Sequence, residues 1–385
     1  MNRRDFLKSG VAISFAAAWP RAVPAQQGGA SLPAPGWRSF EVTSRIDILK
    51  ADAATQVWLP LPCVEAPAWI RNAGNFWSGN ADSVQVVREK TYGAEILHAQ
   101  WNASAGAPSL EVISRFSTRD RMTDFSNPPT PDRLEDRLRT LFTAGTELIP
   151  NDGIVRETAT RIVKGAQIDI DKARAIYEWI VDNTSPNPKT RGCGLGNIRF
   201  MLESGDLSGK CADLNALYVG LCRSIGIPAR DVYGVRVADS RYGYRSLGRS
   251  GEISKAQHCR AEVWLADYGW VPVDPADVRK FVLEEKPGLK LDDALVKDVR
   301  ARLFGAWEMN WMPYNVAHDV ELPNSKGPAL GFLMYPQAEV GDKRVDSLDP
   351  ERFRYTLTSK EIIKPYPLRG RRASIMQDSS LAGPG

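Results

Sequence analysis

The chain has 385 residues, of which 43% are hydrophobic, 25% charged and 9% aromatic. This composition is typical of a globular protein and excludes a disordered or low-complexity chain. The formal net charge is +4, and residues 1–25 contribute four basic residues against one acidic residue, so the remainder carries +1 (4 − 3 = 1). A net charge so near zero gives no electrostatic case for a nucleic-acid-binding protein. No run reaches the roughly 18 apolar residues that a membrane-spanning helix requires.

The N-terminus is expected to be an export signal. Residues 2–8 read Asn-Arg-Arg-Asp-Phe-Leu-Lys, which resembles a twin-arginine signal, and an apolar run follows from Gly10 to Trp19. Small residues at the usual spacing predict cleavage after Ala25. The mature protein is therefore expected in the periplasm or an equivalent exported location, and not as a membrane-spanning protein.

The rest of the chain divides by composition and periodicity. Residues 26–38 read as a linker, and 39–125 alternate apolar and polar residues between turn signals, which predicts a sandwich-like β domain. A proline-rich break opens a connector over 126–150, and helical spacing begins the predicted core at 151–280. Residues 281–373 contain further strand patterns and are expected to extend the core sheet or wall a cleft. The tail at 374–385 is expected to be disordered.

A cysteine is predicted at the start of a helix. Leu214, Leu217, Tyr218 and Leu221 give a helical apolar face that Gly226 ends, so Cys211 falls in the first turn. Backbone N–H groups without partners point outward there and stabilise an anion. A thiolate at such a place has a lowered pKa and is the reactive form of cysteine.

A hairpin follows that carries a histidine and an aspartate. The strand from His258 turns at residues 267–269 and returns to Asp274. A tight two-residue turn would place Asp274 opposite Glu262, four residues short of His258, so a bulge, a strong twist or a wider loop is needed. Nucleophile, base and orienting carboxylate together would suit nucleophilic catalysis by Cys211, His258 and Asp274.

These motifs resemble the transglutaminase-like superfamily. The shared features are a Gly-x-Cys helix that runs into Gly-Ile-Pro-Ala-Arg, and a His-led strand that ends in Tyr-Gly-Trp-Val-Pro-Val-Asp-Pro. The resemblance implies an α+β, papain-like core in which the helix bearing the cysteine packs on an antiparallel sheet. It also implies a Cys211, His258 and Asp274 triad. The family often has an aromatic residue where Arg260 stands, which leaves the acyl pocket undefined.

The resemblance further implies a cysteine hydrolase or acyltransferase. It would attack peptide or side-chain amides through a thioester, and cell-wall peptides are one such substrate. Hydrolysis is favoured over cross-linking because no amine-donor site is visible. The alternatives are true acyl transfer to an amine, and a non-catalytic binding or assembly protein with a vestigial triad. No cofactor and no metal, calcium included, is expected, and the oligomeric state stays open.

The other cysteines and histidines are expected to be structural. In an oxidising compartment Cys63, Cys193, Cys222 and Cys259 would allow two disulfides, whose connectivity the sequence does not define. His98 and His318 lie in strand-like or aromatic surroundings and read as packing residues.

Overall fold

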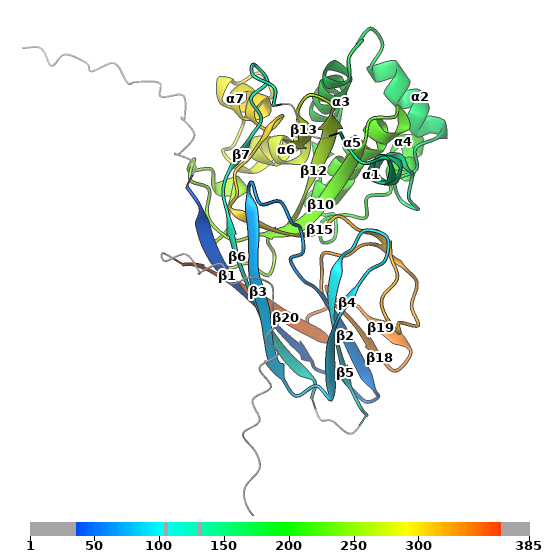
Figure 1. Ribbon diagram of the computed structural model, residues 1–385, viewed down its shortest axis with the longest axis vertical. Helices are drawn as coiled ribbons and strands as arrows, with labels where there is room; N and C mark the ends of the chain where they lie inside the picture. The colour runs from blue at the N-terminus through cyan, green and yellow to red at the C-terminus, as the bar shows by residue number, and fades with distance from the viewer. Residues whose placement is uncertain (1–35, 104–106, 130–132, 363–385) are drawn as a thin grey trace, which may run out of the picture. The chain divides into compact units, whose positions relative to one another are not determined.

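A computed structural model describes residues 36–103, 107–129 and 133–362 (Figure 1). The expected signal, most of the linker and the C-terminal tail lie outside these residues. The described chain combines two five-stranded antiparallel sheets with a four-stranded sheet that helices cover. This confirms the predicted fold class, a mixed α and β core preceded by a β-rich region. Within the described ranges, no helix is long and apolar enough to cross a membrane.

The β-rich region is a sandwich of two sheets. Its strands before the core are β1 to β7, at Arg38–Ile48, Thr55–Pro60, Ile70–Gly79, Ser83–Arg88, Glu95–Trp101, Ser109–Thr118 and Arg121–Met122. One sheet contains β3, β6 and β1, and the other contains β4, β5 and β2. Alternate residues of β1 face inward, as the sequence pattern predicts, and Ile46 packs with Val57 and Val112 between the sheets.

The α+β core is built around one buried helix. The helices are α1 to α7, at Asp136–Thr143, Gly153–Ile162, Asp169–Asn183, Ile198–Ser204, Cys211–Ser224, Pro275–Glu284 and Ala294–Arg302. The sheet has the order β13-β12-β10-β15, formed by Gly269–Val273, Gln257–Leu265, Ala229–Arg236 and Trp311–Asn315. Helix α5 packs on β10 and β12 and contacts α2, α3 and α6 (Figure 1). Nearly every side chain of α5 is buried, so its position is fixed from all sides.

Short pairs of strands connect these parts. Parallel β8 and β9 (Ser185–Pro186 and Ser208–Gly209) lead into α5, and β14 (Ala306–Trp307) pairs with β7. Strands β16 and β17 (His318–Val320 and Leu330–Phe332) form a further pair, and a 3₁₀ turn, η1, spans Arg245–Leu247.

The C-terminal segment returns to the sandwich. Strand β15 joins the core sheet, but β18 (Gln337–Val340) pairs with β2, and β19 (Lys343–Val345) pairs with β18. Strand β20 (Phe353–Ile362) pairs with β1 along its length and with the short β11 (Gly251–Glu252). A single apolar cluster then joins Phe40 and Phe116 of the sandwich to Trp307 and Trp311 of the core. The domain boundaries read from the sequence stay a prediction.

A buried ion-pair group ties the sandwich side to strand β12. Glu262 is 1% exposed and binds Arg121 at 2.5 Å and Arg230 at 2.6 Å. Burial raises the pKa of Glu262, but the two cations outweigh burial and hold it below its usual value. Its contribution to stability is therefore complete at neutral pH and is lost as the pH falls through that lowered pKa.

We expect Glu262→Gln to lower the free energy of unfolding by about 3 kcal/mol, because it leaves buried guanidinium charge uncompensated. Urea unfolding at pH 7 measures this difference. The matched control is Asp136→Asn, which removes the solvent-exposed pair with Arg133 and should change stability by less than about 0.5 kcal/mol. Equal effects of the two substitutions would contradict the account.

Candidate active site

Cys211 is the first residue of helix α5, as the sequence predicts. Lys210 is the N-cap residue and has extended backbone angles. The Cys211 side chain is partly exposed and lines a cleft of about 700 Å³. Its backbone N–H has no acceptor within the described part of the chain. This N–H therefore remains available to an oxygen anion at the helix N-terminus.

Asp213 organises the start of this helix. Its carboxylate accepts the backbone N–H of Lys210 at 2.9 Å, and also those of Leu195 at 3.0 Å and Gly196 at 2.9 Å. The helical spacing predicts that Asp213 points away from Cys211, and the carboxylate caps the helix and holds a neighbouring loop. Gly194 is required there, because its φ is +94° and a Cβ would lie 1.9 Å from an Asp213 oxygen.

That loop brings a second cysteine to the nucleophile. The carbonyl of Cys193 accepts the N–H of Ala212 at 2.9 Å, and its Sγ lies 3.3 Å from the Gln257 carbonyl. Cys193 and Cys259 pack with Cys211 in one apolar cluster, and both of their thiols act on the pKa of Cys211. Neither residue was predicted in the site. The sequence alone does not show that loop 191–196 folds over the start of the helix with Cys193, and Cys259 follows His258 on β12, where alternation points neighbouring residues to opposite faces.

These contacts lower the pKa of Cys211 well below the ordinary thiol value. The largest cause is the hydrogen bond from Cys193, followed by that from Cys259, and His258 adds a hydrogen bond and a positive charge. Burial acts in the opposite direction but does not prevail. Cys211 therefore favours the thiolate.

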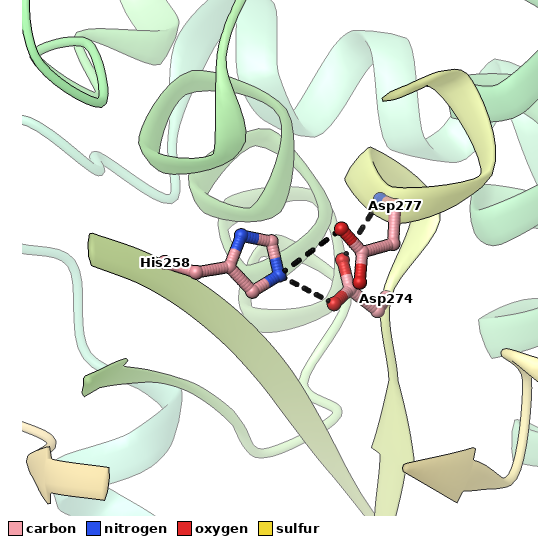
Figure 2. A group of neighbouring side chains, drawn as sticks. All are labelled: His258, Asp274 and Asp277. Atoms are coloured by element: carbon pink, nitrogen blue, oxygen red, sulfur yellow. Dashed lines mark hydrogen bonds and ion pairs between the residues drawn. The ribbon is translucent and has the colours of Figure 1, made fainter. Parts of the chain in front are cut away.

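His258 and Asp274 meet as the sequence predicts. His258 Nε2 lies 2.8 Å from Asp274 Oδ2, and both side chains are buried (Figure 2). The hairpin pairs Leu265 with Gly269 across a three-residue loop and continues to Ala261 opposite Val273, so Asp274 lies two residues nearer to His258 than the sequence analysis placed it. Asp274 then follows the last paired residue of β13 and reaches along the sheet to the imidazole. The other ring nitrogen lies on the side away from the carboxylates (Figure 2).

Asp274 is held by more than the histidine. Its Oδ1 caps helix α6 by accepting the Asp277 N–H at 3.1 Å, and Asn215 Nδ2 lies 3.3 Å away. Burial, and secondly the Asp277 charge, raise the pKa of Asp274, while His258 and Arg260 lower it. The carboxylate is thus fixed by a helix cap, an amide and an imidazole, which leaves the imidazole orientation little freedom.

A second carboxylate and two guanidinium groups complete the buried group. Asp277 Oδ1 lies 3.4 Å from His258 Nε2 and 2.5 Å from Arg236 Nη2. Arg260 Nε lies 3.6 Å from Asp274 Oδ2, and its guanidinium lies 4.9 Å from the ring centre of Trp311. Arg260 therefore places positive charge beside the Asp274 carboxylate and also contacts the Trp311 ring. A signal for both residues existed: Arg260 shares the strand face of His258, and Asp277 is three residues after Asp274 on a helix.

The balance of charges sets the state of the histidine. Burial and Arg236 lower the pKa of His258, but the Asp277 and Asp274 carboxylates outweigh them and raise it. Burial also raises the pKa of Asp277, but Arg236, His258 and Arg260 bring it below its usual value. A lowered thiol pKa beside a raised imidazole pKa favours a thiolate–imidazolium pair over the pH range between them.

The same acidic residues are the candidates for a metal ion. One atom each of His258, Asp274 and Asp277 lies within 4.8 Å of the others. Both carboxylates already face guanidinium groups in addition to the imidazole. An ion here would compete with those internal cations.

The remaining cysteines and histidines lie elsewhere. All five cysteines are free thiols in the structure, so neither of the two disulfides that the sequence allows is formed. Burial raises the pKa of Cys222 to about 12 and that of Cys63 to about 11. His98 stacks on Trp58 and His318 packs against Tyr233, and neither lines the cleft.

The fold and the cysteine-led helix beside a His-Asp pair define a papain-like α+β protein. A family model described as the transglutaminase-like superfamily matches residues 156–275. A Haemophilus influenzae protein, named only as uncharacterized, is 34% identical over 342 residues, which cover 84% of this chain and 91% of that protein. The chain belongs to the transglutaminase-like superfamily.

The similarity to solved structures is more distant. A protein of Cytophaga hutchinsonii, classed provisionally as a cysteine protease, has 12% identity and a TM-score of 0.49, over 88% of this chain and 95% of that chain. The periplasmic domain of TgpA from Pseudomonas aeruginosa has 16% identity and a TM-score of 0.31, over 64% and 88%. Red sea bream transglutaminase has 12% identity and a TM-score of 0.27, over 80% and 60%.

We expect Cys193→Ala to raise the pH midpoint of Cys211 alkylation, because it removes the hydrogen bond that contributes most to the lowered pKa. The measurement is the rate of iodoacetamide labelling against pH, with the modified cysteine located by mass spectrometry. Cys222→Ala is the matched control, since Cys222 is buried in the core and does not line the cleft. An unchanged midpoint in Cys193→Ala would show that Cys193 does not stabilise the thiolate.

Proposed function

We propose that this protein is a cysteine hydrolase that cleaves peptide or protein amides through a thioester on Cys211. The observation that carries the proposal is the hydrogen bond from His258 Nε2 to Asp274 at 2.8 Å, on an imidazole that lines the same cleft as Cys211 and lowers the pKa of its thiol. Nucleophile, base and orienting group are thus present together. Membership of the transglutaminase-like superfamily is consistent with this chemistry.

The first half of the reaction transfers an acyl group to sulfur. The Cys211 thiolate attacks the carbonyl carbon, and the backbone N–H of Cys211 at the helix N-terminus receives the oxygen anion. The His258 imidazolium then gives its proton to the leaving nitrogen as the C–N bond breaks, which releases an amine and leaves a thioester.

The second half returns the enzyme to its starting state. His258, now neutral, takes a proton from a water molecule whose oxygen attacks the thioester carbon. The C–S bond breaks, a carboxylic acid leaves, and the thiolate–imidazolium pair is restored. Asp274 holds the imidazole in the required orientation during both steps and stabilises its charged form.

An exported location fits the proposal. The paired Arg3 and Arg4, the apolar run and the cleavage motif favour twin-arginine export to the periplasm. Fractionation of cells should find the mature protein in the periplasm, and changing both arginines to lysine should hold the precursor in the cytoplasm.

We expect Cys211→Ala to abolish release of amine from a peptide amide, and Asp274→Asn to reduce kcat by roughly a thousandfold or more, since the wrong imidazole tautomer would be favoured. The measurement is product formation by mass spectrometry, with and without an added primary amine. Free acid as the main product in both conditions supports hydrolysis. Predominant amide product with added amine would instead establish acyl transfer, and turnover by Cys211→Ala would overturn the proposal.

A further inference from the structure

The cleft that holds Cys211 is strongly biased toward positive charge. The whole chain has 50 basic and 46 acidic residues, whereas the charged residues that line the cleft are seven basic against two acidic. The basic ones are Arg191, Lys210, Arg236, Arg245, Arg249, Lys255 and Lys280, and the acidic ones are Asp277 and Glu284. The bias therefore belongs to this surface and not to the protein as a whole.

Ion pairs account for both acidic residues. Asp277 pairs with Arg236, and Glu284 lies 3.7 Å from Lys280. Two more of the cations find partners outside the lining set: Arg191 pairs with Asp346, and Arg249 lies 3.9 Å from Glu252.

Three of the seven basic residues that line the cleft have no ion-pair partner in the described part of the chain. Lys210, Arg245 and Lys255 form no ion pair with any residue of the described chain. Glu285 interacts with Arg245 and Glu252 with Lys255 at longer range, but neither carboxylate lines the cleft. A concave wall of low dielectric constant concentrates the field of the cations that line it.

These three cations are attached to well-anchored backbone around the nucleophile. Lys210 immediately precedes Cys211, and Lys255 is three residues before His258. Arg245 lies in the short turn η1, where Glu285 accepts the backbone N–H groups of Arg245 at 3.2 Å and Ser246 at 2.9 Å. The positive end of helix α5 adds to the same field. Cations thus line the cleft from three separate segments of the chain.

We infer that the acyl donor of this enzyme is anionic: a peptide that carries free carboxylates beside the amide that Cys211 attacks. This inference rests on the proposed function and names its substrate class. The cleft volume of about 700 Å³ suits a short peptide segment.

The electrostatic part is tested on the sulfur itself with two reagents of nearly the same size. Anionic iodoacetate and neutral iodoacetamide both alkylate Cys211, and the ratio of their rates, divided by the same ratio for a free thiol, reports the field at the sulfur. The test variant is Arg245→Gln with Lys255→Gln. The matched control is Lys50→Gln with Lys164→Gln, which removes the same charge from two exposed lysines outside the cleft.

We expect the normalised ratio to fall by roughly five- to tenfold in the cleft variant at low ionic strength, and by much less in the control. The difference should shrink in 0.5 M salt, where charges are screened over a few ångströms. Because His258 is intact in both variants, its own charge does not explain a difference between them. Equal ratios in the two variants would overturn the inference.

The substrate part is tested with two peptide amides that differ only in Glu or Gln next to the scissile amide. The acidic peptide should have the higher kcat/KM in the wild type, by roughly fivefold or more, and should lose that preference in the cleft variant only. Equal cleavage of both peptides would also overturn the inference. Failure of the proposed triad would give a different result, because it would remove turnover of both peptides. The ratio of alkylation rates would still report the field in the cleft, since the nucleophilicity of the sulfur cancels from that ratio.

Discussion

The structure depends on a group of charges that is buried together at the end of one hairpin. Arg236, His258, Arg260, Asp274 and Asp277 are each at most 4% exposed. Two guanidinium groups balance two carboxylates, so the group is neutral while the imidazole is neutral. When the Cys211 proton moves to His258, the imidazolium is balanced by the new thiolate. The buried site therefore keeps the same net charge in both proton distributions, which is how a low-dielectric interior tolerates the charged pair.

The need to balance these buried charges explains why the residues around them are held in fixed positions. Asp274 ends strand β13, caps helix α6 and contacts the imidazole, so one carboxylate links a sheet, a helix and the site. At the other side, Asp213 caps α5 and holds the loop that brings Cys193 to the nucleophile. Two neighbouring thiols, those of Cys193 and Cys259, lower the pKa of Cys211 together with the imidazole. The helix N-terminus favours the thiolate as well.

The sequence predicted the parts of this site that depend on local periodicity and chain order. Helix α5 begins at the predicted residue because its apolar spacing and its Gly-Ile-Pro end are local signals. The meeting of His258 with Asp274 was expected, but its register was not, because the size of the turn decides it. Cys193 was missed since its approach depends on a loop that two hydrogen bonds to Asp213 hold. Cys259 was missed because it follows His258 on strand β12, where neighbouring residues point to opposite faces. Strand β20 pairs with β1 over 300 residues away, a distance at which strand patterns do not identify the partner.

The central claim is that Cys211 is a thiolate held beside the imidazolium of His258. The most direct measurement is the pH dependence of iodoacetamide alkylation at Cys211, located by mass spectrometry, in the wild type and in His258→Ala. The account predicts rapid labelling of the wild type at a pH well below the ordinary thiol pKa of about 8.5, and a midpoint that moves to higher pH in His258→Ala. Labelling of Cys211 as an ordinary thiol in the wild type, with no change in His258→Ala, would contradict it.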